Sequence, residues 1–371
     1  MSIIEDRAGG CGSEGVTGIY AVRGQGMKHS QKAPTMKDVS IAAQVSLGTV
    51  SKVINGIPVG EAYRRKVLEA IDRLGYQVNN YARGMRTNRT YSVAFLIPNI
   101  VSPFFAALAN QLNRVLLKRN YRMLLCCTDY NGASEQGYIR MAQQHKVDGI
   151  IGLTYNPDLV IDGQTPFVSI DRMIHPGISV VASDNFAGGE LAARKLSELG
   201  CKRVAFLRVG SSLRNEPNKR KAGFENECRE IGLPFEMKIL TDGESYEAFR
   251  AFLAERIAGG KLGIDGIFCV TDRLAYIIIG MLREMGLRVP EDVQVIGYDG
   301  ARRFGNLAYE CSTIVQPVNE MAEMCVDLLL DRWHSERPSL VCLPVTYAYG
   351  GTTREKIGED HGEIGKLVDV S

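Results

Sequence analysis

Polar side chains that could bind a small hydroxylated molecule recur just after short apolar runs. Asp171 follows the run at residues 167–170, Thr271 follows the run at 266–270, and Asp299 lies two residues beyond the run at 293–297. Carboxylates accept hydrogen bonds from hydroxyl groups, whereas guanidinium and amide groups donate to them, and the C–H face of a sugar can lie on an aromatic ring. These residue types therefore favour a polyhydroxylated ligand.

A single aspartate in such a position has a simpler explanation. Most such residues cap the N-terminus of the following helix, and Asp184 and Asp272 both lie where helices are expected to start. The recurrence of the pattern after several runs, rather than any one aspartate, supports the binding-site hypothesis.

The elements that must position these side chains alternate along the chain. Apolar runs predict strands at residues 92–97, 123–127, 149–152, 167–170, 180–182, 204–207, 266–270 and 293–297. Helices are expected between them, at residues 104–119, 134–144, 187–199, 220–231, 246–257, 273–285 and 318–333. This alternation indicates parallel sheets with helices on both faces. Because the units exceed one sheet, we expect an α/β body of two doubly wound lobes, with ligands beyond the carboxyl ends of the strands.

Positive charge is concentrated nearer the N-terminus. Residues 34–90 contain nine lysines and arginines against four acidic residues, although the formal net charge of the whole chain is only +2. A basic block on a nearly neutral body favours a polyanionic partner for that block alone. A solvated charged face is the alternative.

The basic block contains three expected helices. Thr35 with Asp38 fits the N-cap of a first helix and its acidic capping partner. After a turn at Gln44, Ser46 is expected to cap a second helix that buries one stripe of its surface, formed by Val50, Val53 and Ile54. A third helix at residues 61–74 is expected to bury Val67, Leu68, Ile71 and Leu74.

Two short helices joined by a tight turn and braced by a third form the helix-turn-helix arrangement. The expected exposed face of the second helix presents Leu47, Gly48 and Lys52. The sequence therefore predicts a small all-α head in front of the α/β body.

The segment at residues 76–90 is polar and basic, with Met85 among cations. It buries too little to form a stable isolated helix. One interpretation is a hinge that folds on a nucleic-acid partner, with Met85 as a wedge between base steps. The other interpretation is a plain interdomain linker.

Several classes of protein are disfavoured by what the sequence lacks. Motifs for serine hydrolases, phosphate-binding loops and zinc proteases are missing, and the five histidines are scattered. The nine cysteines form no C-x-x-C pair, which is typical of free thiols in a reducing cytoplasm. No apolar run approaches the ~18 residues of a spanning helix, and no signal peptide is evident. We expect a cytoplasmic protein without enzymatic activity, metal or cofactor, and with no membrane partner.

The sequence resembles the LacI/GalR family of bacterial transcription regulators from about residue 35 to residue 354. The resemblance rests on Thr-Met-Lys-Asp-Val-Ser (35–40), Val-Ser-Leu-Gly-Thr-Val-Ser-Lys-Val-Ile-Asn-Gly (45–56), Ala-Arg-Gly-Met-Arg-Thr-Asn-Arg-Thr (82–90), Ser-Pro-Phe-Phe (102–105), Val-Pro-Glu-Asp-Val (289–293) and Ile-Gly-Tyr-Asp (296–299). It implies a homodimer whose paired heads bind a pseudo-palindromic operator through the major groove, with hinge helices in the minor groove.

The resemblance also implies residue roles. Base edges would be read by Leu47, Gly48 and Lys52, and Met85 would kink the DNA. The remaining DNA contacts would come from Thr35, Ser46, Thr49, Ser51, Asn55, Asn79, Ala82, Arg83 and Arg86. The implied effector contacts are Phe104, Asp171, Arg214, Glu216, Arg220, Thr271 and Asp299.

Several residues depart from the family pattern, among them Gln44 and Lys52. Gln44 stands where glycine is usual in the turn, and a non-glycine residue with positive φ costs about 1 kcal/mol. Lys52 replaces a common arginine, which weakens bidentate recognition of guanine.

We therefore expect five segments. They are a disordered N-terminal extension at 1–33, a helix-turn-helix domain at 34–77, a hinge at 78–90, a two-lobe effector-binding and dimerisation body at 91–354, and a tail at 355–371. Lobe 1 is assigned to residues 91–185 and 317–340, and lobe 2 to residues 186–316 and 341–354.

The resulting hypothesis is a ligand-responsive regulator, a repressor of carbohydrate-utilisation genes. The effector is expected to be a sugar, a sugar acid or a sugar phosphate, with a nucleobase as the second choice. A solute-binding protein without a DNA role is the alternative reading. A sugar-modifying enzyme with Asp171 and Asp299 as its carboxylate pair is a third.

Overall fold

The computed structural model describes residues 34–54, 56–76, 89–156, 158–210, 216–241, 243–302, 307–330 and 338–354. The chain divides into two compact units, one up to Asn79 and one from Asn80. We describe each unit by itself. The extension at 1–33, the tail at 355–371 and most of the expected hinge lie outside the described residues.

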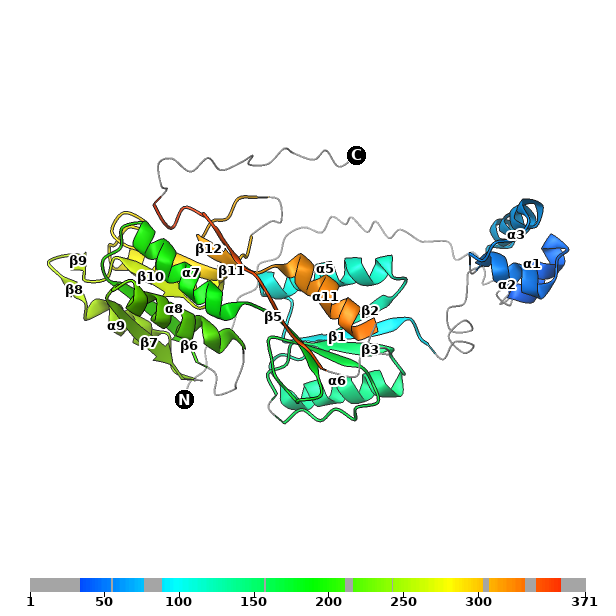
Figure 1. Cartoon of the computed structure of the whole chain (residues 1–371), viewed down its shortest axis with the longest axis horizontal. Coiled ribbons are helices and arrows are strands. Elements are labelled where there is room, and N and C mark those ends of the chain that lie inside the picture. Colours follow the sequence, from blue (N-terminus) through cyan, green and yellow to red (C-terminus); the bar gives the residue numbers. More distant parts are fainter. Residues whose placement is uncertain are drawn as a thin grey trace, which may run out of the picture. The chain divides into compact units, whose positions relative to one another are not determined.

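The described residues of the first unit form three helices, α1 (Met36–Ala43), α2 (Leu47–Ile54) and α3 (Glu61–Leu74) (Figure 1). The predicted capping box before α1 is present, since Asp38 N donates to Thr35 Oγ1 over 3.4 Å and Thr35 N donates to Asp38 Oδ2 over 2.7 Å. Gln44 adopts the left-handed conformation, with φ of 54°. The tight turn is therefore made without glycine, as predicted.

The core of this unit is small and entirely aliphatic. Its buried side chains are Val39, Ala43, Val50, Val67 and Ala70. The prediction that Leu68 points inward is wrong, because 49% of its surface is exposed. The buried stripe of α3 continues from Val67 to Ala70 at a spacing of three, which leaves Leu68 one residue past it.

The second unit is built on two six-stranded sheets within the described residues. The first has the order β13-β5-β4-β3-β1-β2 and the second has the order β14-β12-β11-β10-β6-β7. The first sheet consists of β1 (Ser92–Ile97), β2 (Arg122–Cys127), β3 (Gly149–Gly152), β4 (Phe167–Ile170), β5 (Ser179–Ser183) and β13 (Leu340–Leu343). The second consists of β6 (Val204–Val209), β7 (Phe235–Leu240), β10 (Gly266–Cys269), β11 (Gln294–Asp299), β12 (Thr313–Val315) and β14 (Thr346–Ala348). Neighbouring strands are parallel except for β12 and β14, so the predicted α/β body of two lobes is confirmed.

Helices cover these sheets. In lobe 1, α5 (Pro103–Lys118) and α11 (Val318–Leu330) pack on one face, and α6 (Gly132–Gln144) packs on the other (Figure 1). Lobe 2 carries α7 (Asn185–Glu198), the short η1 (Glu216–Asn218), α8 (Lys219–Glu230), α9 (Glu247–Ala254) and α10 (Asp272–Glu284). A two-stranded sheet, β8 (Ile257–Ala258) with β9 (Lys261–Leu262), projects from lobe 2.

In the part of the body that the structure describes, the chain passes between the lobes after β5, after β12 and after β13. One predicted boundary needs correction, because residues 341–343 belong to lobe 1. There, Val341 and Leu343 pair with Val181 and Ser183 of β5. The chain returns to the lobe 2 sheet at β14, whose three residues pair with β12. The sequence pattern did not reveal this crossing because β13 and β14 are short edge strands.

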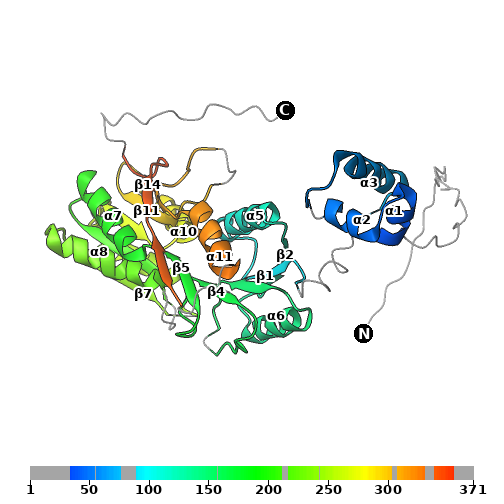
Figure 2. The ribbon, with the colours of Figure 1, turned by 45° about the vertical axis from the view of Figure 1, so that its right-hand side comes forward.

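Helices α7 and α8 lie side by side on lobe 2 (Figure 2). A side-chain carbon on Gly189 would overlap the carbonyl oxygen of Arg220, and one on Gly223 would overlap the carbonyl oxygen of Phe186. The two glycines therefore allow the close approach of the helix backbones. This approach brings the first turn of α8, which carries Arg220, against the start of α7 at Asn185.

Candidate functional sites

The outer surface of α2 presents the predicted base-reading residues to solvent. Gly48 and Lys52 are exposed, and Leu47 is 43% exposed. Ser46 caps the helix, since its Oγ accepts a hydrogen bond from Thr49 N over 3.1 Å. A half-apolar helix face with one cation suits a major groove, where side chains meet both methyl groups and hydrogen-bond acceptors.

The other predicted DNA contacts differ in how exposed their side chains are. Thr35 is exposed but its hydroxyl donates to Asp38 over 2.7 Å, and Ser51 is half-buried. The rest of the set lies outside the described residues, namely Asn55, Asn79, Ala82, Arg83, Met85 and Arg86.

A cavity of about 250 Å³ lies between the two lobes of the second unit. Five of the seven predicted effector residues line it, namely Phe104, Asp171, Arg220, Thr271 and Asp299. Glu216 is buried but does not line the cavity. Its backbone N–H donates to the carbonyl oxygen of Asp171, and its carboxylate pairs with Lys219. Arg214 lies outside the described residues.

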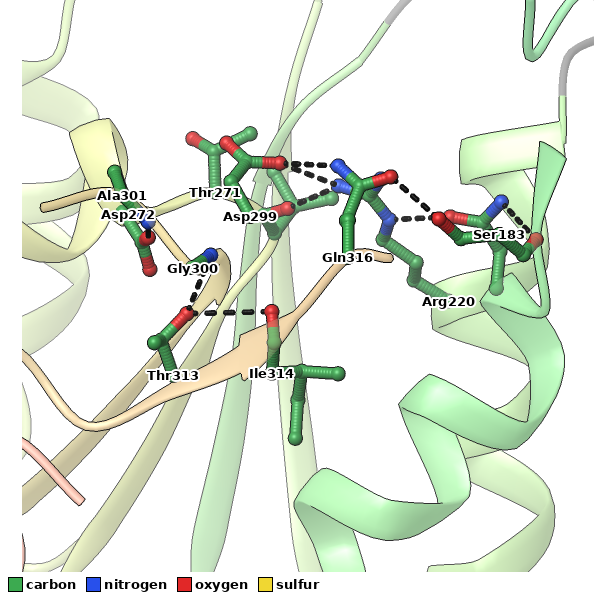
Figure 3. Close-up of polar contacts among 12 residues, drawn as sticks. Ser183, Arg220, Thr271, Asp272, Asp299, Gly300, Ala301, Thr313, Ile314 and Gln316 are labelled. Atoms are coloured by element: carbon green, nitrogen blue, oxygen red, sulfur yellow. Dashed lines mark hydrogen bonds and ion pairs between the residues drawn. The ribbon is translucent and has the colours of Figure 1, made fainter. Parts of the chain in front are cut away.

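The guanidinium of Arg220 contacts four other residues (Figure 3). Its Nε donates to Asn185 Oδ1 and its Nη1 donates to the carbonyl oxygen of Val270, both over 2.7 Å. The guanidinium lies 3.5 Å from the ring centroid of Tyr298, and its Nη1 is 3.7 Å from Asp299 Oδ1. These contacts fix the guanidinium before any ligand arrives, which reduces the entropy that binding costs.

Asp299 connects the two lobes. Its Oδ1 accepts a hydrogen bond from Gln316 Nε2 over 2.8 Å, and Gln316 Oε1 accepts one from Ser183 Oγ of lobe 1 over 2.6 Å (Figure 3). Burial raises the pKa of Asp299 to about 7, although the charge of Arg220 acts in the opposite direction. The carboxyl group therefore changes its protonation near neutral pH.

Asp171 faces the cavity from the end of β4. Burial raises the pKa of its carboxyl group, while the nearby charges of Arg220 and Arg172 lower it. Its Oδ1 is buried without a hydrogen-bond partner. The backbones of Asp171 and Asp299 both have positive φ, 57° and 127° respectively. Strained backbone of this kind is typical of functional sites.

Asp272 does not cap α10, contrary to the prediction from the sequence. The residue that caps α10 is Thr271, whose Oγ1 accepts a hydrogen bond from Leu274 N over 3.2 Å. Asp272 instead lies buried under β11, where its Oδ2 accepts from Ala301 N over 2.7 Å (Figure 3). Burial and the negative charge of Asp299 raise the pKa of Asp272 well above its ordinary value. Asp184, by contrast, is the predicted cap, since its Oδ1 accepts from Ala187 N over 3.0 Å.

Comparisons with known proteins agree with this arrangement. The family model of bacterial regulatory proteins, lacI family, matches residues 35–79, and that of the periplasmic binding protein-like domain matches residues 193–353. The sucrose operon repressor of Pediococcus pentosaceus is 31% identical over 309 residues, which covers 81% of this chain and 92% of that protein. This chain belongs to the LacI family. The resemblance seen in the sequence is therefore confirmed.

Further relatives of this LacI-family protein point the same way. The ribose operon repressor of Halalkalibacterium halodurans is 33% identical over 305 residues, covering 80% of this chain and 89% of the relative. The solved structure of a periplasmic binding protein/LacI transcriptional regulator from Alkaliphilus metalliredigens, complexed with D-xylulofuranose, has a TM-score of 0.61 at 26% identity. The match covers 71% of this chain and 100% of that one. This LacI-family protein is a DNA-binding transcriptional regulator with an effector-binding body, and it is not an enzyme. The reading as a solute-binding protein without a DNA role is set aside.

Sequence reasoning missed several cavity residues of this LacI-family regulator. They include Tyr130, Tyr155, Arg208, Tyr246, Arg273 and Gln316. Arg172 also lines the cavity, and its position directly after Asp171 and a strand is the signal that points to it. Arg208 gives no such signal because it lies inside β6, and Gln316 follows a strand of only three residues.

Two further properties bear on the chemistry of this regulator. Among the described residues, no group of three histidine, cysteine or acidic side chains is arranged to hold a metal ion. Within the same ranges, no helix combines the length and apolar character needed to cross a membrane.

Proposed function

We propose that this LacI-family regulator is a repressor of carbohydrate-utilisation genes. It binds a pseudo-palindromic operator as a homodimer, and a sugar-like effector between the lobes sets its affinity for DNA. The observation that supports this most directly is the interlobe cavity, in which Asp171, Arg220 and Asp299 present acceptors and donors near aromatic rings. The printed names of the relatives, repressors of sucrose and ribose operons, support the same ligand class.

The proposed DNA contacts lie in the helix-turn-helix head and in the expected hinge. Leu47 and Lys52 read base edges, and Gly48 lets the helix approach the bases closely. Phosphates are contacted by Thr35, Ser46, Thr49, Ser51 and Asn55, and the minor groove by Asn79, Ala82, Arg83, Met85 and Arg86. A dimer doubles these contacts over two half-sites, which gives the operator its two-fold symmetry. The site of action is the cytoplasm, on the nucleoid when the operator is occupied.

The proposed effector contacts are Asp171, Arg220, Thr271 and Asp299, with Phe104 beneath the sugar ring and Arg214 as a further contact. Glu216 is proposed to act indirectly, because its backbone N–H donates to the carbonyl oxygen of Asp171. The link from Asp299 through Gln316 to Ser183 supports the idea that a ligand bound here changes how the lobes sit against each other. Such a change alters the spacing of the two heads in the dimer and hence the affinity for DNA, by a coupling free energy of about 1–3 kcal/mol.

Base recognition by α2 is tested with the substitution Lys52→Ala in the full chain. An operator is first selected from a random duplex pool, and binding is then measured by fluorescence anisotropy. Loss of one base contact is expected to weaken binding to the selected operator by about tenfold while leaving binding to unrelated DNA nearly unchanged. Arg86→Ala is expected to weaken binding to both DNAs, because a positive charge in the minor groove is attracted to the phosphate backbone of any sequence.

Lys118→Ala is the matched control, because Lys118 is an exposed lysine on α5 of the body. It is expected to bind like the unsubstituted protein. If Lys52→Ala and the unsubstituted protein bind the selected operator equally well, α2 is not the reading helix.

A further inference from the structure

The described residues that line the interlobe cavity include more cations than anions. Four arginines, Arg172, Arg208, Arg220 and Arg273, face two aspartates, Asp171 and Asp299. Burial raises the pKa of both aspartates, and that of Asp299 rises to about 7, so Asp299 carries only part of a negative charge near neutral pH. A neutral sugar needs no such excess, because hydroxyl groups are satisfied by balanced donors and acceptors.

Arg220 does not account for this excess. Its Nε and Nη1 already donate to Asn185 and to the carbonyl oxygen of Val270, and it lies beside Asp299 (Figure 3). The other three arginines supply the remaining positive charge, and among them Arg172 carries a buried donor atom that has no hydrogen-bond partner.

Arg172 belongs to lobe 1 and is 7% exposed. Its Nε donates to the carbonyl oxygen of Thr154 over 3.2 Å, and its guanidinium lies 4.4 Å from the ring centroid of Tyr155. Its Nη1 is buried without a hydrogen-bond partner. An unsatisfied donor on a charged group is costly in a protein interior, so this position favours an additional acceptor.

Arg208 and Arg273 belong to lobe 2. Arg208 projects from β6, is 8% exposed and is oriented by a hydrogen bond to Asn218 Oδ1. Arg273 lies in the first turn of α10 and is exposed, so it stands at the margin of the cavity. Arginines of both lobes thus border the same space.

We propose that the effector of this regulator is an anionic sugar of monosaccharide size, carrying a carboxylate or a phosphate group. The inference rests on the proposed function and narrows its ligand class. Asp171 and Asp299 bind hydroxyl groups, and the anionic group lies among Arg172, Arg208 and Arg273. Guanidinium matches carboxylate and phosphate oxygens in a two-pronged geometry.

The size of the cavity supports a single sugar ring. Its volume of about 250 Å³ is below the ~300–1,000 Å³ that is typical of sites for drug-sized ligands. An anion shared by both lobes also draws them together, which is the movement that the proposed function requires.

The test measures ligand binding to the full chain by thermal shift and titration calorimetry. The members of each pair differ at one carbon, where the anionic member carries a carboxylate in place of a hydroxymethyl group or a phosphate on that group. The pairs are glucuronate with glucose, galacturonate with galactose, gluconate with sorbitol, and glucose 6-phosphate with glucose. We expect at least one anionic member to bind at least tenfold more tightly than its neutral partner. The carboxylate and phosphate arms show which anion is preferred.

Two substitutions localise the anion. Arg273→Gln changes an exposed side chain and should leave folding intact, and Arg172→Gln changes a buried one. Each is expected to weaken binding of the anionic ligand about tenfold to a hundredfold and to leave binding of its neutral partner unchanged. Arg140→Gln on the exposed face of α6 is the control and should bind like the unsubstituted protein.

The outcomes separate this inference from the proposed function. Tighter binding of neutral sugars than of their charged partners overturns the anionic effector but leaves a sugar-responsive regulator. Equal loss of neutral and anionic ligand in Arg273→Gln also overturns it. If no sugar of either kind binds, the sugar effector of the proposed function fails as well.

Discussion

At the scale of single residues, Asp299 is the side chain on which the effector site depends most. It lies beside Arg220, accepts from Gln316 and shares a buried region with Asp272. Two carboxyl groups so close together in the protein interior resist being charged at the same time. The site therefore holds protons at a pH where exposed aspartates have lost theirs.

This proton uptake makes stability depend on pH. The pKa of Asp299 is about 7 in the folded chain and about 3.9 in an unfolded one. Between these values the folded state binds more protons than the unfolded state, so stability falls as pH rises from about 4 to about 7. Without ligand, the melting temperature of the unsubstituted protein should fall over this range more steeply than that of Asp299→Asn.

Scanning calorimetry or dye fluorescence at half-unit pH steps measures both proteins. Parallel curves for Asp299→Asn and the unsubstituted chain would contradict the raised pKa. A difference confined to pH below 4 would contradict it equally, since an ordinary aspartate titrates there.

The residue scale also shows what sequence could reveal about the site. Asp171, Thr271 and Asp299 were predicted because they follow apolar strands, and parallel strands end at one edge. Arg208 could not be found this way, because it interrupts an apolar strand instead of following it. The raised pKa values of Asp171 and Asp299 could not be predicted from the sequence, because the burial and the neighbouring charges come from elements far apart in the chain.

At the scale of elements, the packing of α7 on α8 positions the binding side chains. Asn185 begins α7 and Arg220 lies in the first turn of α8, so their hydrogen bond depends on how closely the helices approach. Gly189 and Gly223 make the approach possible, because any larger side chain would overlap the backbone of the other helix.

Gly223→Ala should therefore destabilise the body by more than about 2 kcal/mol, since the added carbon must push the helices apart. Gly137→Ala is the matched control, because Gly137 is in the interior of α6 and has open space where the carbon would go. There the substitution should stabilise by about 0.5–1 kcal/mol. Urea unfolding measures both, and equal effects at the two positions would contradict the close packing of α7 on α8.

Some helices and strands could be predicted from the sequence and others could not. Buried strands such as β1 and β4 were predicted because apolar side chains point to both faces. The strand β7 was not predicted, because it lies at a sheet edge and its residues alternate between apolar and charged. In α3, Leu68 was assigned to the core on apolar character alone, although the helical period places Ala70 there.

At the scale of the whole molecule, one unit carries the candidate DNA-binding residues and the other carries the candidate effector site. The head carries Lys52 and Leu47 on an exposed helix face, and the body holds a cavity between two lobes. Family membership was predictable from motifs in both units, because these motifs mark the turn of the head and the strand ends of the body. The place where the chain recrosses between lobes after β13 was not predictable, since pairing of short edge strands depends on the finished sheets.

The central claim is that a ligand in the body controls DNA binding by the head. The most direct measurement is the affinity of the full chain for its selected operator, by fluorescence anisotropy, without ligand and with a saturating concentration of a sugar that binds the cavity. The operator Kd is expected to change by about 5- to 150-fold, and operator DNA is expected to change the ligand Kd by the same factor. Superimposable operator titrations with and without saturating ligand would contradict the central claim.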